Sequence, residues 1–222
     1  MTDSKLQRLN MVESQVRPSD VTDRRIIKAM MDVPREKFVP PLLASMAYMD
    51  EPVPLDAVNG EGGRYLLAPR TFAKLVQLAE IGPDAVVLDV GCATGYSTAV
   101  LAQLAKRVVA IESDKAFAEQ ARRLLEEVGA SNVAVVEGRL TGGVPAQGPY
   151  DAIVLNGAVA QIAPVLLEQL KDGGRLAAIL VDGPLSRAQV WRRGGKTFDT
   201  RPAFDASAAV LPGFEPLAAF VF

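Results

Sequence analysis

Short apolar runs alternate with amphipathic segments through most of the chain after Arg70. This pattern predicts strands at 85–90, 107–112, 133–137, 152–155 and 175–181, and helices at 71–80, 96–105, 114–128 and 162–170. Because the strands are continuously apolar and separated by helices, we expect them to be parallel, with helices on both faces of the sheet. The pattern therefore predicts an α/β protein with a doubly wound, mostly parallel, Rossmann-like sheet.

The N-terminal part of the chain has a different pattern. Residues 5–31 are predicted to be helical, and Asp23 would cap the stretch from Arg24 in which Ile26, Ile27 and Met30 share a face. Prolines after residue 33 end this pattern. Residues 48–69 are rich in Pro, Gly and Asp, so we expect a long loop, which is either functional or a surface connector.

The C-terminal part has strand-like runs without helices between them. These runs lie at 189–192, 197–201, 206–211 and 217–222, and Gly and Pro separate them. Such spacing favours an antiparallel hairpin at the edge of the sheet. We therefore expect one compact unit, with a helical extension and substrate-side loop at 1–70 and the core with its hairpin at 71–222.

Composition narrows the classes of function. The chain has 222 residues and a formal net charge of −2, which gives no overall attraction to nucleic acid. No apolar run suggests a signal core or a membrane span, and the single cysteine predicts no internal disulfide, so a cytoplasmic protein is expected. The chain has no histidine, which excludes serine-histidine and cysteine-histidine pairs and histidine metal ligands; we predict no metal site.

A small-residue loop follows the first predicted core strand. Asp89 lies near the end of that strand, the segment Gly91–Gly95 follows, and a helix is predicted from Tyr96. Small residues allow a cofactor to approach the backbone at the open end of a parallel strand. Glu112 ends the next strand about twenty residues later, where a carboxylate can accept both hydroxyls of a ribose. The spacing predicts a site for a nucleoside cofactor.

Three interpretations of this loop differ in what it binds. The sequence Gly91-Cys92-Ala93-Thr94-Gly95 lacks the third glycine of the dinucleotide motif, which argues against a dehydrogenase. Asp89 would repel a pyrophosphate but suits the sulfonium-bearing amino acid of S-adenosylmethionine. We therefore favour a methyltransferase; a turn that uses its glycines only for geometry is the remaining alternative. Cys92 is expected to be a small filler of the turn rather than a nucleophile.

Motifs outside the loop carry a family resemblance. They are the runs at 21–30 and 47–50, the run Pro34-Arg35-Glu36-Lys37-Phe38-Val39-Pro40, the loop 63–69, Gly142-Gly143, 149–151 and 169–176. Over residues 5–181 the chain resembles the protein-L-isoaspartate O-methyltransferases. The resemblance implies a class I methyltransferase fold and methyl transfer from S-adenosylmethionine, giving S-adenosylhomocysteine. It implies as acceptor the free carboxylate of isoaspartyl residues in damaged proteins or peptides, a protein-repair activity.

Three departures from the family pattern fall in the implied pocket. The family loop ends in Gly-x-x-Ile-Ser-x-Pro with its serine at the substrate site, and this chain has Leu67 there. An acid that contacts the adenine amine in the family is replaced by Arg139, and a loop glycine is replaced by Ala93. Either backbone and neighbouring groups do the same work, or repair is weak or lost. In the second case the pocket serves another acceptor or only binds the cofactor.

The candidate site follows from both arguments. Leu67 marks the catalytic position of the family serine, beside Tyr65 and Leu66 on the substrate side. We expect the charged run Arg35-Glu36-Lys37 to be a solvated helix end rather than a substrate contact. The predicted cofactor-binding residues are Tyr65, Leu66, Asp89, Gly91, Ala93, Tyr96, Glu112, Ser113, Arg139, Leu140 and Asn156.

Overall fold

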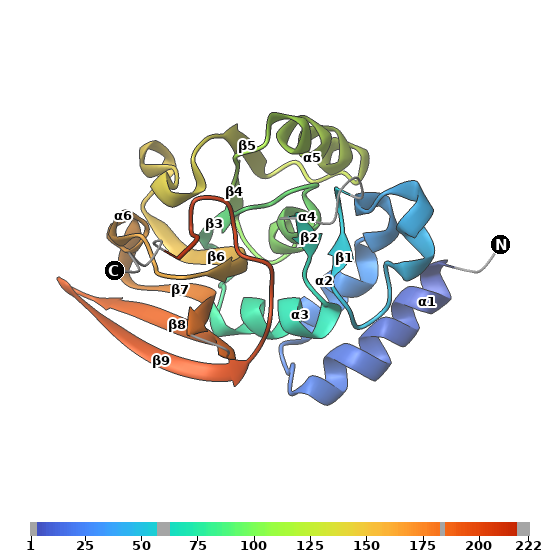
Figure 1. Cartoon of the computed structure of the whole chain (residues 1–222), viewed down its shortest axis with the longest axis horizontal. Coiled ribbons are helices and arrows are strands. Elements are labelled where there is room, and N and C mark those ends of the chain that lie inside the picture. Colours follow the sequence, from blue (N-terminus) through green and yellow to red (C-terminus); the bar gives the residue numbers. More distant parts are fainter. Residues whose placement is uncertain (1–3, 57–62, 183–184, 217–222) are drawn as a thin grey trace, which may run out of the picture.

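The computed structural model describes residues 4–56, 63–182 and 185–216, and within them it contains a mixed seven-stranded sheet (Figure 1). The spatial order is β5-β4-β3-β6-β7-β8-β9; neighbours from β5 to β7 are parallel, and β7, β8 and β9 pair antiparallel. The strands are β3 (Val86–Val90), β4 (Arg107–Glu112), β5 (Val133–Glu137), β6 (Tyr150–Val159), β7 (Leu170–Asp182), β8 (Leu185–Gly194) and β9 (Thr197–Asp205). The predicted doubly wound, mostly parallel sheet is confirmed.

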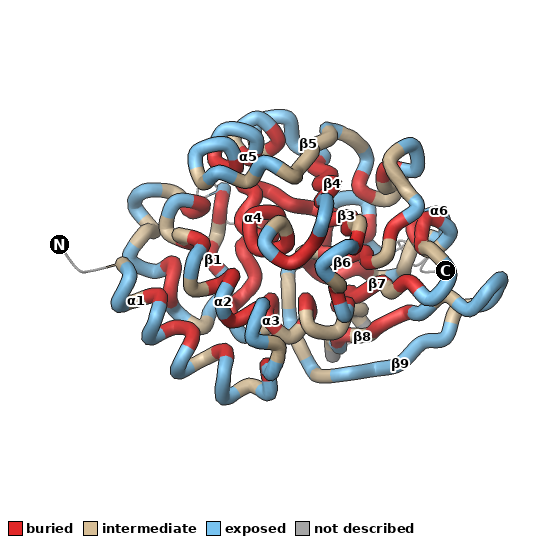
Figure 2. Tube along the Cα trace, turned by 180° about the vertical axis from the view of Figure 1, so that it is seen from behind, coloured by how far each residue is buried: buried red, intermediate tan, exposed pale blue. Residues whose placement is uncertain are grey.

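The sheet buries both faces because neighbouring residues of its strands point to opposite sides. Val87 packs in the cluster formed with the larger helices, whereas Leu88 packs in the cluster on the other face. Figure 2 shows buried residues, in red, along the central strands and exposed residues, in pale blue, along β9. Helices of the first face are α3 (Pro69–Leu78), α4 (Tyr96–Ala102) and α5 (Lys115–Glu127). The second face is covered by α6 (Pro164–Glu168), the 3-10 turns Leu140–Gly142 and Pro145–Gln147, and residues of the C-terminal part.

The N-terminal extension packs against the first face, but not as one helix. The predicted helix over 5–31 is wrong in its continuity: α1 (Ser4–Met11) passes into a π-helical turn, Val12–Val16, and a 3-10 turn, Arg17–Ser19, before α2 (Arg24–Asp32). Pro18 and the left-handed Asp20, with φ of 61°, end the first part. Asp23 caps α2 as predicted, because its carboxylate accepts a hydrogen bond from the Arg25 N–H.

The predicted loop over 48–69 contains regular structure. Two short strands, β1 (Val53–Pro54) and β2 (Tyr65–Leu66), pair antiparallel, and two 3-10 turns, Arg35–Phe38 and Pro41–Met46, lie before them. A carboxylate at Asp56 accepts two hydrogen bonds from the Arg64 N–H, at 2.9 and 3.1 Å. These bonds tie the chain just after β1 to the residue before β2.

The C-terminal part confirms the hairpin, formed by β8 and β9, but corrects the next run. Residues 206–211 were predicted as a strand; they form only an isolated parallel bridge, Ala158 with Val210. The chain turns back after β9 and crosses the front of β6 and β3, as the dark red segment in Figure 1 shows. The predicted run at 217–222 lies outside the described residues. Among the residues described, no helix has the length and apolar character needed to cross a bilayer.

Candidate active site

The centre of the sheet has a topological switch point. β3 pairs with β4 on one side and with β6 on the other. The chain leaves the carboxyl end of β3 toward β4 but leaves that of β6 toward β7, so the two connections run in opposite directions. Ligands in open α/β sheets bind in the crevice that this reversal creates. Asp89, Glu112 and Asn156 all lie at this edge, at or near the ends of β3 and β4 and within β6.

The loop after β3 is shaped by positive φ angles at Gly91 (75°), Ala93 (47°) and Gly95 (94°). For Ala93 this left-handed conformation costs roughly 1 kcal/mol. It aims the Ala93 N–H at Glu112 Oε2, 2.7 Å away. Thr94 donates from its hydroxyl to the Phe38 carbonyl at 2.6 Å, so the loop is also tied to the N-terminal extension.

Asp89 is fully buried and its acceptors are occupied. Ser97 and Thr98 at the start of α4 donate to Oδ2 at 2.8 and 2.6 Å, and the Asn156 amide donates to Oδ1. Burial raises the pKa of Asp89 to about 6, although these three hydrogen bonds oppose the shift. The carboxylate therefore fixes α4 and β6 to the end of β3.

Glu112 is also fully buried, but it has a cationic partner. Its oxygens accept hydrogen bonds from the backbone N–H groups of Ala93, Ser113 and Asp114, at 2.7, 2.7 and 3.0 Å. Burial opposes ionisation, but the hydrogen bonds and positive charge of Arg64 outweigh it and lower the pKa of Glu112. This carboxylate stays ionised in the folded protein.

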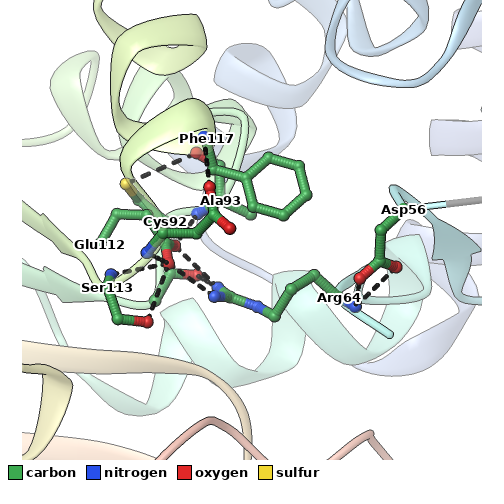
Figure 3. Close-up of polar contacts among 9 residues, drawn as sticks. Asp56, Arg64, Cys92, Ala93, Glu112, Ser113 and Phe117 are labelled. Carbon is green, nitrogen blue, oxygen red and sulfur yellow. Dashed lines mark hydrogen bonds and ion pairs between the residues drawn. The ribbon is translucent and has the colours of Figure 1, made fainter. Parts of the chain in front are cut away.

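Arg64 spans the site and takes both oxygens of Glu112 (Figure 3). Its two terminal nitrogens lie 2.6 and 2.8 Å from Oε1 and Oε2, and one also donates to the Gly91 carbonyl at 3.0 Å. Only 8% of the residue is exposed. The pairing is bidentate, which is the strongest arrangement of an arginine and a carboxylate. The two terminal nitrogens of Arg64 thus occupy the positions at Glu112 in which the sequence predicts two ribose hydroxyls.

Leu211, from the segment after β9, lies over the glycines of the site. A Cβ added at Gly91 would lie 2.8 Å from its side chain, and one added at Gly157 would lie 2.7 Å from it. Both distances are far below normal carbon contacts, so Leu211 sits directly on the backbone. It is 2% exposed and belongs to the core of the second face, together with Phe214.

Little space remains between these side chains. Two voids of about 10 Å³ each are left, one lined by Leu67, Gly91 and Ser97 and the other by Arg64, Gly157 and Leu211. Each holds about one water, whereas small-molecule sites span roughly 300–1,000 Å³. S-adenosylmethionine does not fit the residues in this arrangement, because Arg64 and Leu211 fill its space.

Most predicted site residues are nevertheless brought together. Tyr65, Leu66, Leu67, Gly91, Ala93, Tyr96 and Asn156 line the first void. Ser113 lies beside Glu112, to which its hydroxyl donates at 3.3 Å. Leu140 is buried in the core of the second face, and Arg139 is exposed and lines neither void. Arg139 and Leu140 therefore lie apart from the seven predicted residues that line the first void.

Arg35 corrects the prediction of a solvated helix end. It is fully buried, donates to the carbonyls of Ala47 and Leu67 at 2.6 and 2.8 Å, and stacks 4.7 Å from the centroid of the Tyr96 ring. Arg35 therefore fixes the backbone of the Leu67 position. Cys92 is buried, and burial with the nearby carboxylates raises the pKa of its thiol, which fits a filler rather than a nucleophile.

Sequence reasoning missed Arg64 and Leu211. Neither lies in the cofactor motif, and their partners are distant along the chain: Glu112 is 48 residues from Arg64. Ser97 and Thr98 were also missed, but their signal was present. Two hydroxyls in the first turn of a helix can reach back to a carboxylate near the end of the preceding strand.

The fold and the loop define the class I S-adenosylmethionine-dependent methyltransferases. The family model for protein-L-isoaspartate(D-aspartate) O-methyltransferase (PCMT) matches residues 7–210. The chain belongs to this family. A Herpetosiphon aurantiacus protein-L-isoaspartate O-methyltransferase is 40% identical over 79% of this chain and 76% of the relative. One from Methanoregula boonei is 37% identical over 86% of each.

Solved structures agree with this placement. A protein-L-isoaspartate O-methyltransferase superposes with a TM-score of 0.81 at 26% identity, covering 93% of this chain and 66% of that one. A Plasmodium falciparum structure in complex with S-adenosyl-L-homocysteine superposes with a TM-score of 0.77, covering 92% of this chain and 97% of that one. At 16% identity the second comparison supports the fold alone.

Proposed function

We propose that this chain transfers a methyl group from S-adenosylmethionine to the free carboxylate of L-isoaspartyl residues in damaged proteins or peptides. The observation that carries the proposal is the family match over residues 7–210, which spans both the cofactor loop and the substrate-side segment. The glycine loop, Asp89 and Glu112 lie together at the switch point, which agrees with the family's cofactor. The proposed setting is the cytoplasm, with protein or peptide substrates and no nucleic acid.

The chemistry suits a chain without histidine. The acceptor carboxylate has a pKa of about 4, so it is ionised at neutral pH and needs no side-chain base. Its attack on a methyl donor depends on alignment. In this chain Leu67 holds the position beside the acceptor, and Arg35 fixes the backbone carbonyl of Leu67 at 2.8 Å.

A second candidate is methyl transfer to a different acceptor. It is favoured by Leu67, whose buried apolar side chain replaces the serine that the resemblance places at the substrate site. Such a side chain offers no hydrogen bond to a carboxylate. The two candidates share the cofactor and differ only in the acceptor.

Turnover on matched peptides tests the proposal. Purified protein with radiolabelled S-adenosylmethionine is given an isoaspartyl peptide and its aspartyl twin, and methyl ester formation is counted. We expect methylation of the isoaspartyl peptide alone, at least 100-fold above the twin. Equal labelling of both peptides, or labelling of neither, would reject isoaspartate specificity in favour of the second candidate.

A further inference from the structure

The two acceptor oxygens that define the predicted ribose site are both taken. Arg64 supplies two N–H donors to Glu112 at 2.6 and 2.8 Å, in the geometry that a pair of vicinal hydroxyls would use. Three backbone N–H groups donate to the same two oxygens. A ribose therefore cannot bind Glu112 until the Arg64 side chain leaves.

The backbone of the site is covered from a second direction. Leu211 fills the space over Gly91 and Gly157, where the absence of a Cβ lets its side chain approach the backbone closely. It is placed by hydrogen bonds between the segment and β6: Ala158 donates to the Ala209 carbonyl and Leu211 to the Ala158 carbonyl, each at 2.8 Å. Ala160 donates to the Phe214 carbonyl at 2.9 Å.

The segment that carries Leu211, residues 206–214, borders a large cavity on its other side. Ala209 lines the small void above Gly157 and also a cavity of about 750 Å³ bounded by Tyr65, Lys74 and Phe204. At Ala209 a single stretch of backbone therefore separates the site from this cavity. The segment's backbone hydrogen bonds to the sheet are those of the Ala158 bridge, the one from Ala160 to Phe214, and one from Ala206 to the Ser186 carbonyl at 3.1 Å, rather than a strand ladder. Few bonds must therefore break for it to open while the sheet stays folded.

We infer that Arg64 and residues 206–214 form an internal plug that excludes S-adenosylmethionine from this chain until the plug is displaced. The inference rests on the proposed function for the identity of the ligand. Cofactor affinity is then the intrinsic affinity reduced by the small fraction of molecules with the plug open. Whatever withdraws the plug, such as a substrate seated in the 750 Å³ cavity, turns on cofactor binding.

Binding of S-adenosylhomocysteine tests the plug without requiring turnover. Isothermal titration calorimetry compares the whole chain with Arg64→Ala, Leu211→Ala and the double variant. Each single change weakens the closed state, so we expect the dissociation constant to fall at least tenfold for each and further for the double variant. Glu112 keeps its three backbone donors in Arg64→Ala, which leaves the acceptor ordered.

Matched controls separate the plug from a loss of stability. Arg8→Ala removes an arginine with the same 8% exposure, and Leu104→Ala removes a leucine 4% exposed; neither lines the two voids. We expect both controls to bind within twofold of wild type, with folding checked by circular dichroism. Folded plug variants that bind no tighter than wild type would overturn the inference, and so would a complete absence of binding in all of them.

Hydrogen exchange gives an independent readout on the unaltered chain. If the cofactor displaces the plug, adding S-adenosylhomocysteine speeds amide exchange in residues 206–214, whereas slower exchange there would show a segment that closes over the ligand and would overturn the inference. The peptide assay separates the two proposals. Tight binding by the opened variants without isoaspartyl methylation rejects the proposed function and leaves the plug standing.

Discussion

Two carboxylates at adjacent strand ends, Asp89 and Glu112, are satisfied in opposite ways. Asp89 draws two of its hydrogen bonds from hydroxyls eight and nine residues away and has no cationic partner among its described contacts. Glu112 is neutralised by Arg64, 48 residues away, beside Leu211 from the far end of the chain. Burial raises the pKa of Asp89, whereas Arg64 lowers that of Glu112.

The partners of the two carboxylates differ in how firmly they are packed into the fold. The partners of Asp89 belong to α4 and β6, which are parts of the packed sheet. Those of Glu112 include the Arg64 side chain beside a short hairpin, and this side chain is covered by a segment that joins β6 through a few hydrogen bonds rather than a strand ladder. The contacts of Asp89 therefore belong to the fixed core of the protein. The Glu112 side of the pocket is instead filled by Arg64 and the C-terminal segment, which can move away without unfolding the sheet.

Removing the charge of Glu112 should have the largest effect on stability. Glu112→Gln leaves the Arg64 guanidinium buried without a counter-charge, and breaking a buried pair in this way costs about 3–5 kcal/mol. Urea denaturation followed by circular dichroism at pH 7 measures the loss. Glu119→Gln removes an exposed carboxylate from an i,i+4 pair and should cost less than about 0.5 kcal/mol. A loss below about 1 kcal/mol in Glu112→Gln would show that Arg64 is solvated.

The sequence predicts the Asp89 side better than the Glu112 side. β4 and β5 were predicted to the residue and β3 to within one, since apolar runs and short-range caps are local signals. The loop and both carboxylates could be found because the motif is local too. Arg64 and Leu211 carry no periodicity, and their roles depend on long-range docking, which one sequence does not specify. Arg35 was missed for a related reason: charge alone favoured solvent.

Asp89 should make stability fall as pH rises. Its pKa is about 6 in the folded chain against a usual 3.8, so the folded state binds the proton more tightly and loses that advantage between about pH 4 and 6. Relative to Asp89→Asn, wild type should lose about 2–3 kcal/mol between pH 4 and 7. Urea unfolding at pH 4.5, 5.5 and 7 gives the difference. The exposed Asp199→Asn should follow wild type, and a constant Asp89→Asn difference would contradict the shift.

Truncating a leucine to alanine should cost more stability in the central strand than in the C-terminal segment. Leu88, fully buried within β3, has no room to relax, so Leu88→Ala should cost about 4 kcal/mol. Leu211→Ala should cost about 2 kcal/mol, because its segment borders a cavity and can settle into the space. The same denaturation experiment compares them. Equal losses would mean that the C-terminal segment is as firmly packed as the central strand.

A substitution at Leu67 should have the smallest effect of those considered, and it tests the part of the pocket that would hold the methyl acceptor. In the Arg64→Ala/Leu211→Ala background, Leu67→Ser adds a hydroxyl that can donate to the incoming carboxylate. A hydrogen bond to a charged group contributes about 1.5 kcal/mol, so KM for an isoaspartyl peptide should fall about tenfold. Affinity for S-adenosylhomocysteine should not change. Leu66→Ser is the control, because it also lines the void but sits one residue away in β2. Equal effects of both serines would mean that polarity, rather than a positioned donor, limits the acceptor.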